Sequence, residues 1–331
     1  MRCAAIRLAG LIGCLSLASV THAESVADDI IQRQLAEAYA TTILLADGEA
    51  IQLGLVNFNP NDYARLEDDN LGTEESISGR EKLSLLSVPL ELEIPVSLID
   101  HDVHGGLRFS MLREVERGKL ATSIQPEEDR FETRVYSVEG NLRWRYHFTD
   151  TWSLDLGQAL YLMRYENRTD FRNGDSRDLR PGLDGLITNH SSEAWVSRTT
   201  TGFAWTPDQE EARTEYFTTF NYLAGNSIRP DRSEHDAEPE AWYWRNGVRT
   251  KIPVFQDSDA DKFVLLKLSR VNVGGDLPNP MGSSVFYEAG AGFVSSTNGR
   301  IPFVRNLGLF LNINYGSDLR GGTLGILYNV D

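Results

Sequence analysis

The chain has 331 residues, a formal net charge of -16 and a mean hydropathy of -0.33. With 48 acidic residues against 32 Lys and Arg, it is a poor partner for nucleic acid, and we expect none. Beyond the N-terminus no segment approaches 18 consecutive apolar residues, which excludes an ordinary transmembrane helix. Hydropathy alone would indicate a soluble secreted protein, but it misses barrel strands, in which polar lumen-facing residues alternate with apolar lipid-facing ones.

Residues 1-23 have the pattern of a secretory signal peptide. Arg2 and Arg7 precede an apolar stretch from Leu8 to Val20, which ends in Thr21-His22-Ala23. This stretch is shorter than the roughly 20 residues that a membrane-spanning helix needs. We therefore expect cleavage after Ala23.

A lipoprotein signal is the alternative for the same segment, because Leu11-Ile12-Gly13-Cys14 resembles the box at which bacterial lipoproteins are cleaved and lipidated. Cleavage after Ala23 fits better, since the apolar run continues past Cys14. It would remove both cysteines, Cys3 and Cys14, so we expect no disulfide and no thiol metal site in the mature chain. It would also leave 30 basic against 48 acidic residues, a formal charge of -18.

Residues 24-42 are expected to form an N-terminal helix. The segment from Ser25 to Thr41 begins with a capping box, Ser25-Val26-Ala27-Asp28, and places Ile31, Leu35 and Ala38 along one stripe. Two interpretations remain open, a plug inside a barrel lumen and a surface helix in the periplasm. We favour the plug, because a polar lumen satisfies the charged face of the helix.

Residues 43-331 alternate between apolar and polar side chains in runs that suit the roughly 9 to 11 residues of a spanning strand. From Leu86 to Leu98 every second residue is apolar, and from Tyr136 to Phe148 nearly every second residue is apolar or aromatic. Similar runs begin at Trp152 and at Leu307. A soluble β-sandwich would also bury these faces, but charged residues of both signs on the opposite faces favour a hydrated lumen.

The links between the runs alternate in length. Long links lie near 59–80, 118–130, 168–193, 227–238 and 274–282, and short links lie near 99–104, 149–151, 207–211, 256–261 and 296–301. Outer-membrane barrels have long external loops and short periplasmic turns. Counting from a first strand near Ile43 to Phe58 to a last strand at Gly322 to Val330 gives about twelve strands.

We therefore predict an all-β fold, a transmembrane antiparallel up-and-down β-barrel of about 12 strands with the N-terminal α-helix in its lumen. Closure is expected, because an open edge in lipid leaves backbone groups unpaired. Aromatic residues near the run ends, such as Tyr146, Phe148, Trp152, Trp242 and Trp244, fit interfacial girdles. The lumen-lining candidates, which include cations and carboxylates able to pair, are Glu91, Glu93, Arg143, Arg145, Asp155, Lys267 and Glu288.

The last strand carries a candidate assembly signal. Thr323 to Val330 reads polar, any, Gly, any, any, aromatic, any, apolar, and so resembles the terminal signal read by the barrel-assembly machinery. Gly325, Tyr328 and Val330 are its defining positions. The chain departs from the usual pattern in ending one residue later, at Asp331.

The helix, the strand count and the terminal strand together resemble the translocator domain of autotransporters. Those proteins carry a long secreted passenger ahead of the helix, whereas here the helix follows the expected cleavage site almost directly. The chain thus looks most like the solitary autotransporter-type β-barrels. The resemblance implies a non-enzymatic structural, surface-exposed or transport role in the outer membrane of a Gram-negative bacterium. It also implies no cofactor, and as partners outer-membrane lipid, lipopolysaccharide and the barrel-assembly machinery, with no oligomer required.

Three groups of histidines were weighed for chemistry. Asp100-His101-Asp102-Val103-His104 contains metal and acid-base residue types but falls on an expected short periplasmic turn. His190 and His235 fall on long external loops, where omptin-type proteases and outer-leaflet lipid hydrolases keep their catalytic groups, but the surrounding sequence does not match those families. We expect no catalytic, cofactor-binding or metal-binding residues. The alternatives are a small-solute porin-like channel and an outer-membrane hydrolase that uses these loop histidines.

Overall fold

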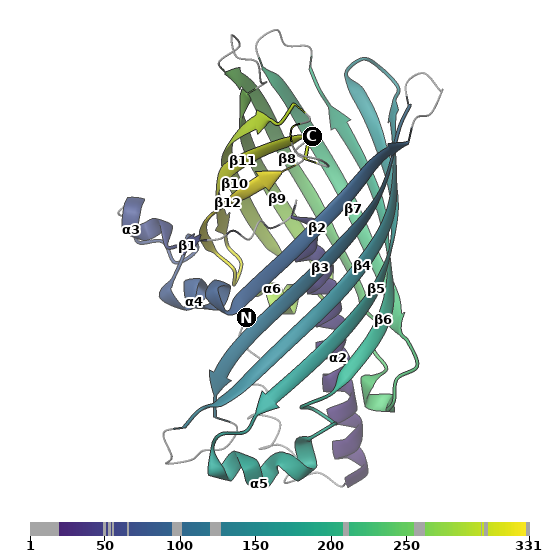
Figure 1. The fold of residues 1–331 in the computed structure, drawn as a ribbon, viewed down its shortest axis with the longest axis vertical. Helices are drawn as coiled ribbons and strands as arrows, with labels where there is room; N and C mark the ends of the chain where they lie inside the picture. Colours follow the sequence, from purple (N-terminus) through teal and green to yellow (C-terminus); the bar gives the residue numbers. More distant parts are fainter. Residues whose placement is uncertain are drawn as a thin grey trace.

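A computed structural model describes residues 20–48, 51, 54, 56–64, 66–94, 101–119, 127–207, 212–254, 262–298, 300 and 304–328. These residues form one antiparallel sheet in the strand order β1-β12-β11-β10-β9-β8-β7-β6-β5-β4-β3-β2, which curves into a barrel (Figure 1). The twelve strands are β1 Val56–Phe58, β2 Leu83–Ile94, β3 His101–Gly118, β4 Asp129–His147, β5 Trp152–Asp170, β6 Ser191–Trp205, β7 Arg213–Ser227, β8 Glu240–Val254, β9 Lys262–Gly275, β10 Val285–Ser296, β11 Asn306–Tyr315 and β12 Gly321–Tyr328. The predicted all-β, up-and-down fold of twelve strands is confirmed.

Helix α2 (Val20–Asp47) enters the barrel from the long-loop end, and its C-terminal part lies inside (Figure 1). The expected helix is therefore present but longer, and the prediction of a first strand near Ile43 to Phe58 is wrong. The apolar run from Ile43 to Leu45 is compatible with either a strand or a buried helix, and here it continues the helix. Its side chains are buried on all sides because the barrel wall surrounds them. The expected signal peptide lies outside the described residues except for Val20 to Ala23, which begin α2.

The sheet is not closed among the described residues, which corrects the expectation of closure. Its edges are β2, which pairs only with β3, and β1, which pairs with β12 over three residues. Strand β1 is short, and helix α3 begins at Pro60, directly after it. Helix α4 (Glu74–Lys82) contacts β1, β2 and β3 at this opening. Its Arg80 is 1% exposed and donates through Nη1 to the carbonyls of Leu319 (2.6 Å) and Gly321 (3.2 Å).

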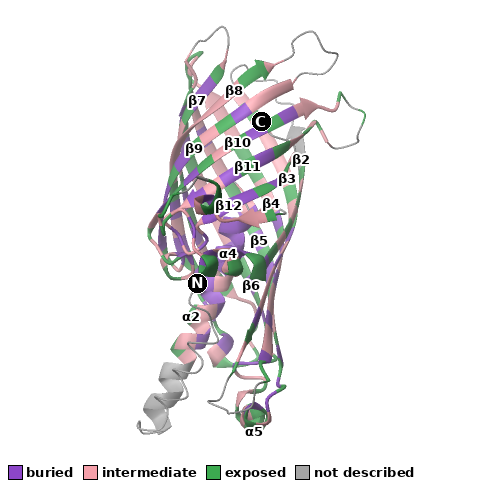
Figure 2. Ribbon diagram, turned by 90° about the vertical axis from the view of Figure 1, so that its left-hand side faces the viewer, coloured by how far each residue is buried: buried purple, intermediate pink, exposed green. Residues whose placement is uncertain are grey.

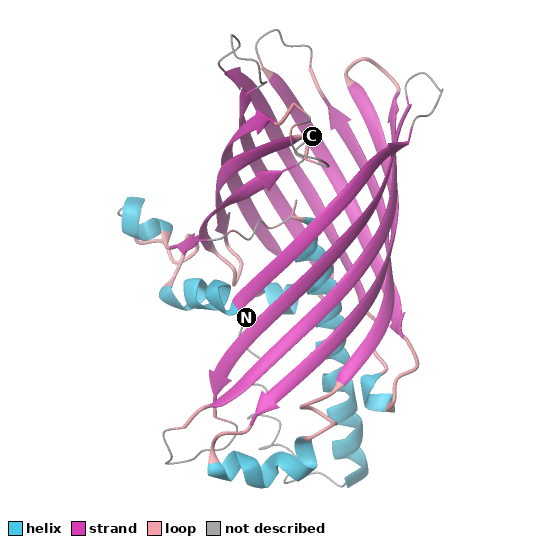
Figure 3. Cartoon of the chain, in the orientation of Figure 1, coloured by secondary structure: helices cyan, strands magenta, loops and turns pink. Residues whose placement is uncertain are grey.

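The remaining helices lie on the long links, and Figure 3 shows the helices in cyan. They are α3 (Pro60–Ala64), α4, α5 (Gly174–Leu183), η1 (Ser233–His235) and α6 (Pro278–Met281). Between β3 and β9 the links alternate between long and short in the predicted order. None of the described helices, α2 included, is long and apolar enough to cross a membrane.

The outward face of the barrel is apolar between two levels of aromatic rings. Leu160 and Leu162 of β5 are 51% and 56% exposed, and Figure 2 shows the alternation of exposed and covered positions along the strands. At the short-turn end the ring of Trp205 stacks on those of Trp152 and Tyr216, with centroids 6.0 and 5.2 Å away. At the long-loop end the ring of Phe220 stacks on that of Trp242. This arrangement is the one expected of a barrel in a bilayer.

Candidate functional site

The lumen is filled along most of α2 by an apolar core. Ile31, Leu35, Tyr39 and Ile43 recur every four residues along the helix and are all buried. They belong to one cluster with inward-facing residues of the wall, such as Tyr161 of β5. The helix therefore packs against the inner wall as a core element and is not a loosely hydrated segment.

The C-terminal end of α2 is held by basic residues of the wall. The carbonyl oxygen of Ala46 accepts hydrogen bonds from Arg108 Nη1 at 2.9 Å and from Ser87 Oγ at 3.4 Å. The last carbonyls of a helix have no partner within the helix and carry partial negative charge, so a guanidinium is favourable there. Arg108 comes from β3 and Ser87 from β2, so the helix end is tied to one side of the barrel.

Asp47, the last residue of α2, lies in a network of buried charges that we call the Asp47 cluster: Asp47, Arg108, Glu139, Arg198 and Tyr243. Tyr243 Oη donates to Asp47 Oδ2 at 2.8 Å, and Arg198 Nη1 lies 3.4 Å from Asp47 Oδ1. Glu139, which is 1% exposed, lies 3.2 Å from Arg198 and 3.6 Å from Arg108. The charge of Arg245 also acts on Asp47, so the two carboxylates lie among three guanidinium groups, and buried charges of this kind require such partners.

Beyond the end of the helix, toward the short turns, the lumen keeps a cavity of about 470 Å³. It is lined by the Asp47 cluster residues Arg108, Glu139 and Arg198 and by further charged residues of the wall. The helix therefore fills one part of the lumen and leaves a charged chamber in the other. Such a chamber suits water and ions more than an apolar ligand.

The structure places the predicted lumen-lining residues in three different surroundings. Arg143, Asp155 and Lys267 line the cavity, and Asp155 lies 3.1 Å from Arg143 and 2.8 Å from Arg145. Glu288 is buried near α4 and accepts a hydrogen bond from Asn312 Nδ2 at 3.1 Å. The side chains of the remaining two residues, both on β2, lie outside the described part of the structure; they are Glu91 and Glu93.

The predicted assembly positions lie at the end of β12. Gly325 pairs with Phe310, and a Cβ at Gly325 would lie 2.4 Å from the Phe310 ring, so only glycine leaves room for it. Tyr328 is the last residue of the strand and pairs with Leu307. Val330 lies outside the described residues. The role of these positions in assembly stays a prediction.

The interpretation of residues 100–104 as a turn is wrong for the described part, because β3 begins at His101. Trp144 Nε1 donates to His101 Nδ1 at 2.9 Å, and the two rings are stacked. His147 Nε2 lies 2.9 Å from Asp102 Oδ2. These contacts run between neighbouring strands, and such cross-strand pairs extend the ladder to His101.

His190 and His235 come together at the long-loop end, although they are far apart in sequence. Their rings are stacked with centroids 4.5 Å apart, and His235 Nε2 lies 3.0 Å from the carbonyl oxygen of Leu186. Burial, followed by the charge of His235, lowers the pKa of His190 to about 4. Among the described residues neither ring is hydrogen-bonded to a carboxylate or a hydroxyl group. A triad-type hydrolytic site needs those contacts.

A twelve-stranded sheet with an apolar outer face, a charged lumen and an internal helix defines an integral outer-membrane β-barrel. The family described as "Solitary outer membrane autotransporter beta-barrel domain" matches residues 36–330. The chain belongs to this family, and it is a protein of the outer membrane of a Gram-negative bacterium.

Solved structures with a similar fold include two autotransporter domains and one other barrel. The beta domain of the Bordetella autotransporter BrkA matches with a TM-score of 0.44 and 12% identity, covering 74% of this chain and 86% of that one. LpxR from Salmonella typhimurium matches with a TM-score of 0.36 and 11% identity, covering 72% and 86%. The transport unit of the autotransporter AIDA-I from Escherichia coli matches with a TM-score of 0.34 and 8% identity, covering 83% and 100%. No curated protein sequence matches the chain.

Proposed function

We propose that the protein is a non-enzymatic barrel whose pore is closed by its own helix α2. The observation that carries this proposal is the attachment of the helix end: Asp47 and the Ala46 carbonyl are both bound by wall residues deep in the lumen. A helix that only passes through the pore would not require an ion-paired and hydrogen-bonded attachment at its last residue. The apolar contacts of Leu35 and Tyr39 support the same conclusion, because they fill the lumen beside the helix.

The charged chamber beyond the helix is the reason to keep a small-solute channel as the second candidate. Its lining by Arg143, Asp155 and Lys267 is suited to the passage of ions, but only when α2 no longer blocks the lumen. We propose that these residues, together with Glu91 and Glu93, line the water-filled part of the pore. The two candidate functions differ in whether helix α2 leaves the lumen.

Conductance in planar bilayers separates them. We expect the full chain to conduct poorly and a variant that lacks residues 24–47 to form open pores. The matched control is a variant with cysteines in place of Glu37 and Asn279, whose side chains are hydrogen-bonded between α2 and α6, joined by a short thiol-reactive linker. The linked protein should stay closed. Steady conductance of the full chain that neither deletion nor linking alters would contradict the plug and favour a channel.

Absence of catalysis is tested separately. We expect the purified full chain to release nothing from peptide or lipid substrates, because among the described residues neither stacked ring is hydrogen-bonded to a carboxylate or a hydroxyl group. Turnover that disappears in both His190→Ala and His235→Ala, with the barrel still folded, would make the protein a hydrolase.

We further propose that β12 is read by the barrel-assembly machinery. The glycine at position 325 lies beneath the Phe310 ring, and Tyr328 closes the strand. Tyr328→Ala should lower the amount of folded protein in the outer membrane, whereas Tyr63→Ala on exposed α3 should not. Equal amounts of folded protein from the two variants would contradict a role of Tyr328 in assembly.

A further inference from the structure

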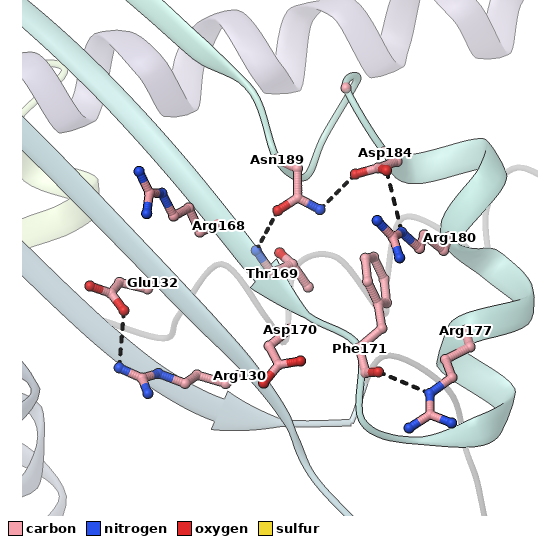
Figure 4. A pocket seen from close by; sticks show the side chains of 11 residues that line it. Arg130, Glu132, Arg168, Thr169, Asp170, Phe171, Arg177, Arg180, Asp184 and Asn189 are labelled. Carbon is pink, nitrogen blue, oxygen red and sulfur yellow. Dashed lines mark hydrogen bonds and ion pairs between the residues drawn. The ribbon is translucent and has the colours of Figure 1, made fainter.

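Arginine side chains gather on the outward face of the barrel where β3, β4 and β5 approach the long loops. The arginine patch consists of Arg113, Arg130, Arg134, Arg164, Arg168 and Arg180. The first five share the outward face with the lipid-facing residues of the same strands, since Arg164 and Arg168 follow Leu160 and Leu162 at even positions of β5. Arg180 comes from α5, which lies beside the ends of these strands (Figure 4).

The patch begins where the apolar band ends. Along the outward face of β5 the band runs from Trp152 to Leu162, and the next outward residue is Arg164. Ten residues at about 3.4 Å each, tilted by about 45°, span roughly 24 Å, close to the height of about 25 Å that the apolar band of such barrels has. The arginines therefore lie at the level of the lipid headgroups. Because long loops are external, this is the outer leaflet.

The patch has fewer carboxylates than guanidinium groups, although the chain as a whole is acidic. One carboxylate, that of Glu132, contacts Arg113 at 2.7 Å, Arg130 at 3.0 Å and Arg134 at 2.5 Å. A single negative charge leaves this group of four with an excess of two positive charges. Arg168 lies directly across from Glu132 in the strand register.

The other arginines of the patch share three more carboxylates. Glu166 lies 3.1 Å from Arg164 and 3.4 Å from Arg168, Glu193 lies 3.2 Å from Arg164, and Asp184 lies 3.3 Å from Arg180. Six guanidinium groups thus face four carboxylates. The neighbouring Arg177 adds another cation, whose Nε donates to the carbonyl oxygen of Phe171 and not to a carboxylate.

A cavity of about 740 Å³ lies between these strand ends and α5. Its lining includes Arg130, Arg168, Arg177 and Arg180 from two strands and one helix, and Figure 4 shows their side chains around a common space. Guanidinium groups bind phosphate oxygens through two parallel hydrogen bonds. The carboxylates of Glu132, Asp170 and Asp184 also line the space and oppose an anion, so binding depends on the excess of four arginines over three carboxylates.

We propose that the arginine patch binds the phosphate groups of a phosphorylated glycolipid of the outer leaflet, with the acyl chains lying against Leu160 and Leu162. Two features favour a lipid over a soluble phosphate: the cations lie at headgroup level, and an exposed apolar surface adjoins them directly. The patch would thereby fix the position of this side of the barrel in the outer leaflet. The proposal rests on the orientation of the barrel and is independent of whether α2 closes the pore.

The test is titration of the full chain, in a zwitterionic detergent, with diphosphoryl lipid A and detection of the complex by native mass spectrometry. The variant Arg134→Gln/Arg168→Gln should lower the affinity by about tenfold or more, because each lost charge-assisted hydrogen bond weakens binding severalfold. The matched control is Arg232→Gln, an exposed arginine on the β7–β8 loop, which should bind as the unaltered chain does. The variant Arg134→Lys/Arg168→Lys keeps the charge but not the paired hydrogen bonds. Its affinity for lipid A should lie between those of the glutamine variant and the control.

Two further arms distinguish the source of the phosphate. Lipid A without its phosphates should bind at least about tenfold more weakly if the arginines recognise phosphate. Inorganic pyrophosphate should compete only at much higher concentration, because it lacks the acyl chains. Equal binding of lipid A by the glutamine variant and the control, with both still shifting on heating in a gel, would overturn the site. Tight binding of pyrophosphate without binding of lipid A would overturn the lipid as the ligand.

Discussion

The two ends of α2 are held in the barrel by different physical means. At the C-terminal end, deep in the lumen, Asp47 is bound by Tyr243 and by buried arginines that Glu139 also contacts. At the mouth, the helix makes polar contacts with loop residues, such as the hydrogen bond from Gln32 Nε2 to the Ser233 carbonyl at 2.8 Å. The first end is enclosed by the wall, and the second is exposed to solvent, as the side chains of Asp29 and Arg33 are. This difference indicates that the helix is anchored at its C-terminal end, deep in the lumen, and that its outer half is the part able to loosen.

The largest effect is expected from Asp47→Ala. It leaves Arg108 and Arg198 with Glu139 as their remaining carboxylate in the Asp47 cluster, and breaking a buried ion pair costs about 3–5 kcal/mol. Faster hydrogen exchange along α2 and more frequent pore opening would report the loss. Asp62→Ala, on the exposed helix α3, is the matched control and should change neither. Unchanged exchange in α2 would mean that the inner end is not the anchor.

The next largest effect is expected from Leu35→Ala in the middle of the helix. Leu35 is buried in the core between helix and wall, and removing such a side chain costs about 2–5 kcal/mol. Exchange should quicken in α2 while the barrel keeps its heat-dependent shift on gels. Leu162→Ala, which removes the same atoms from the lipid-facing surface, should leave α2 exchange unaltered.

A smaller, pH-dependent effect is expected at the mouth. The pKa of His190 is lowered by burial and by His235 to about 4, below the ordinary value of 6.5. When the loops that carry His190 and His235 separate, His190 regains its ordinary pKa and binds more protons between pH 4 and 6.5. The packing of these two loops therefore weakens as the pH falls from about 6.5 toward 4, and it is constant above that range. Protease cleavage near η1 should increase at pH 5 relative to pH 7.5. In His190→Phe, which keeps a stacked ring without a titrating group, the increase should be much smaller.

The smallest effect is expected from Gln32→Ala. One hydrogen bond at a solvent-exposed position contributes about 0.5–1.5 kcal/mol at most. Exchange should quicken only around Gln32, in the outer half of α2, and not near Asp47. Faster exchange that extends to the residues near Asp47 would show that the two ends are coupled, and the distinction between them would not hold.

Much of the architecture could be predicted from local patterns. Alternation along the strand that contains Leu160 and Leu162 shows which face meets lipid, and the alternation of link lengths gives the direction of the barrel. Both are properties of neighbouring residues, so one sequence contains them. The run from Ile43 to Leu45 was misassigned because a short apolar run has no period that separates strand from buried helix.

The sites could not be predicted in the same way. Arg108 and Arg198 were not among the predicted lumen residues. Their charge at inward-facing strand positions is a signal for the lumen, but it does not say which carboxylate they bind. The arginine patch escaped notice because Arg113, Arg134 and Arg168 belong to three strands and are brought to one level by the strand register.

Periodicity in the sequence specifies the approximate number of strands, the two faces of the wall and the helix ahead of them, because it fixes which side chains share a face. Only the tertiary structure decided where that helix ends, which charges meet at Asp47 and how the arginines of three strands gather around Glu132. These depend on strand register and on the curvature of the sheet. Both bring together residues that are distant in the chain, and hydrogen bonds and charge balance select the final arrangement.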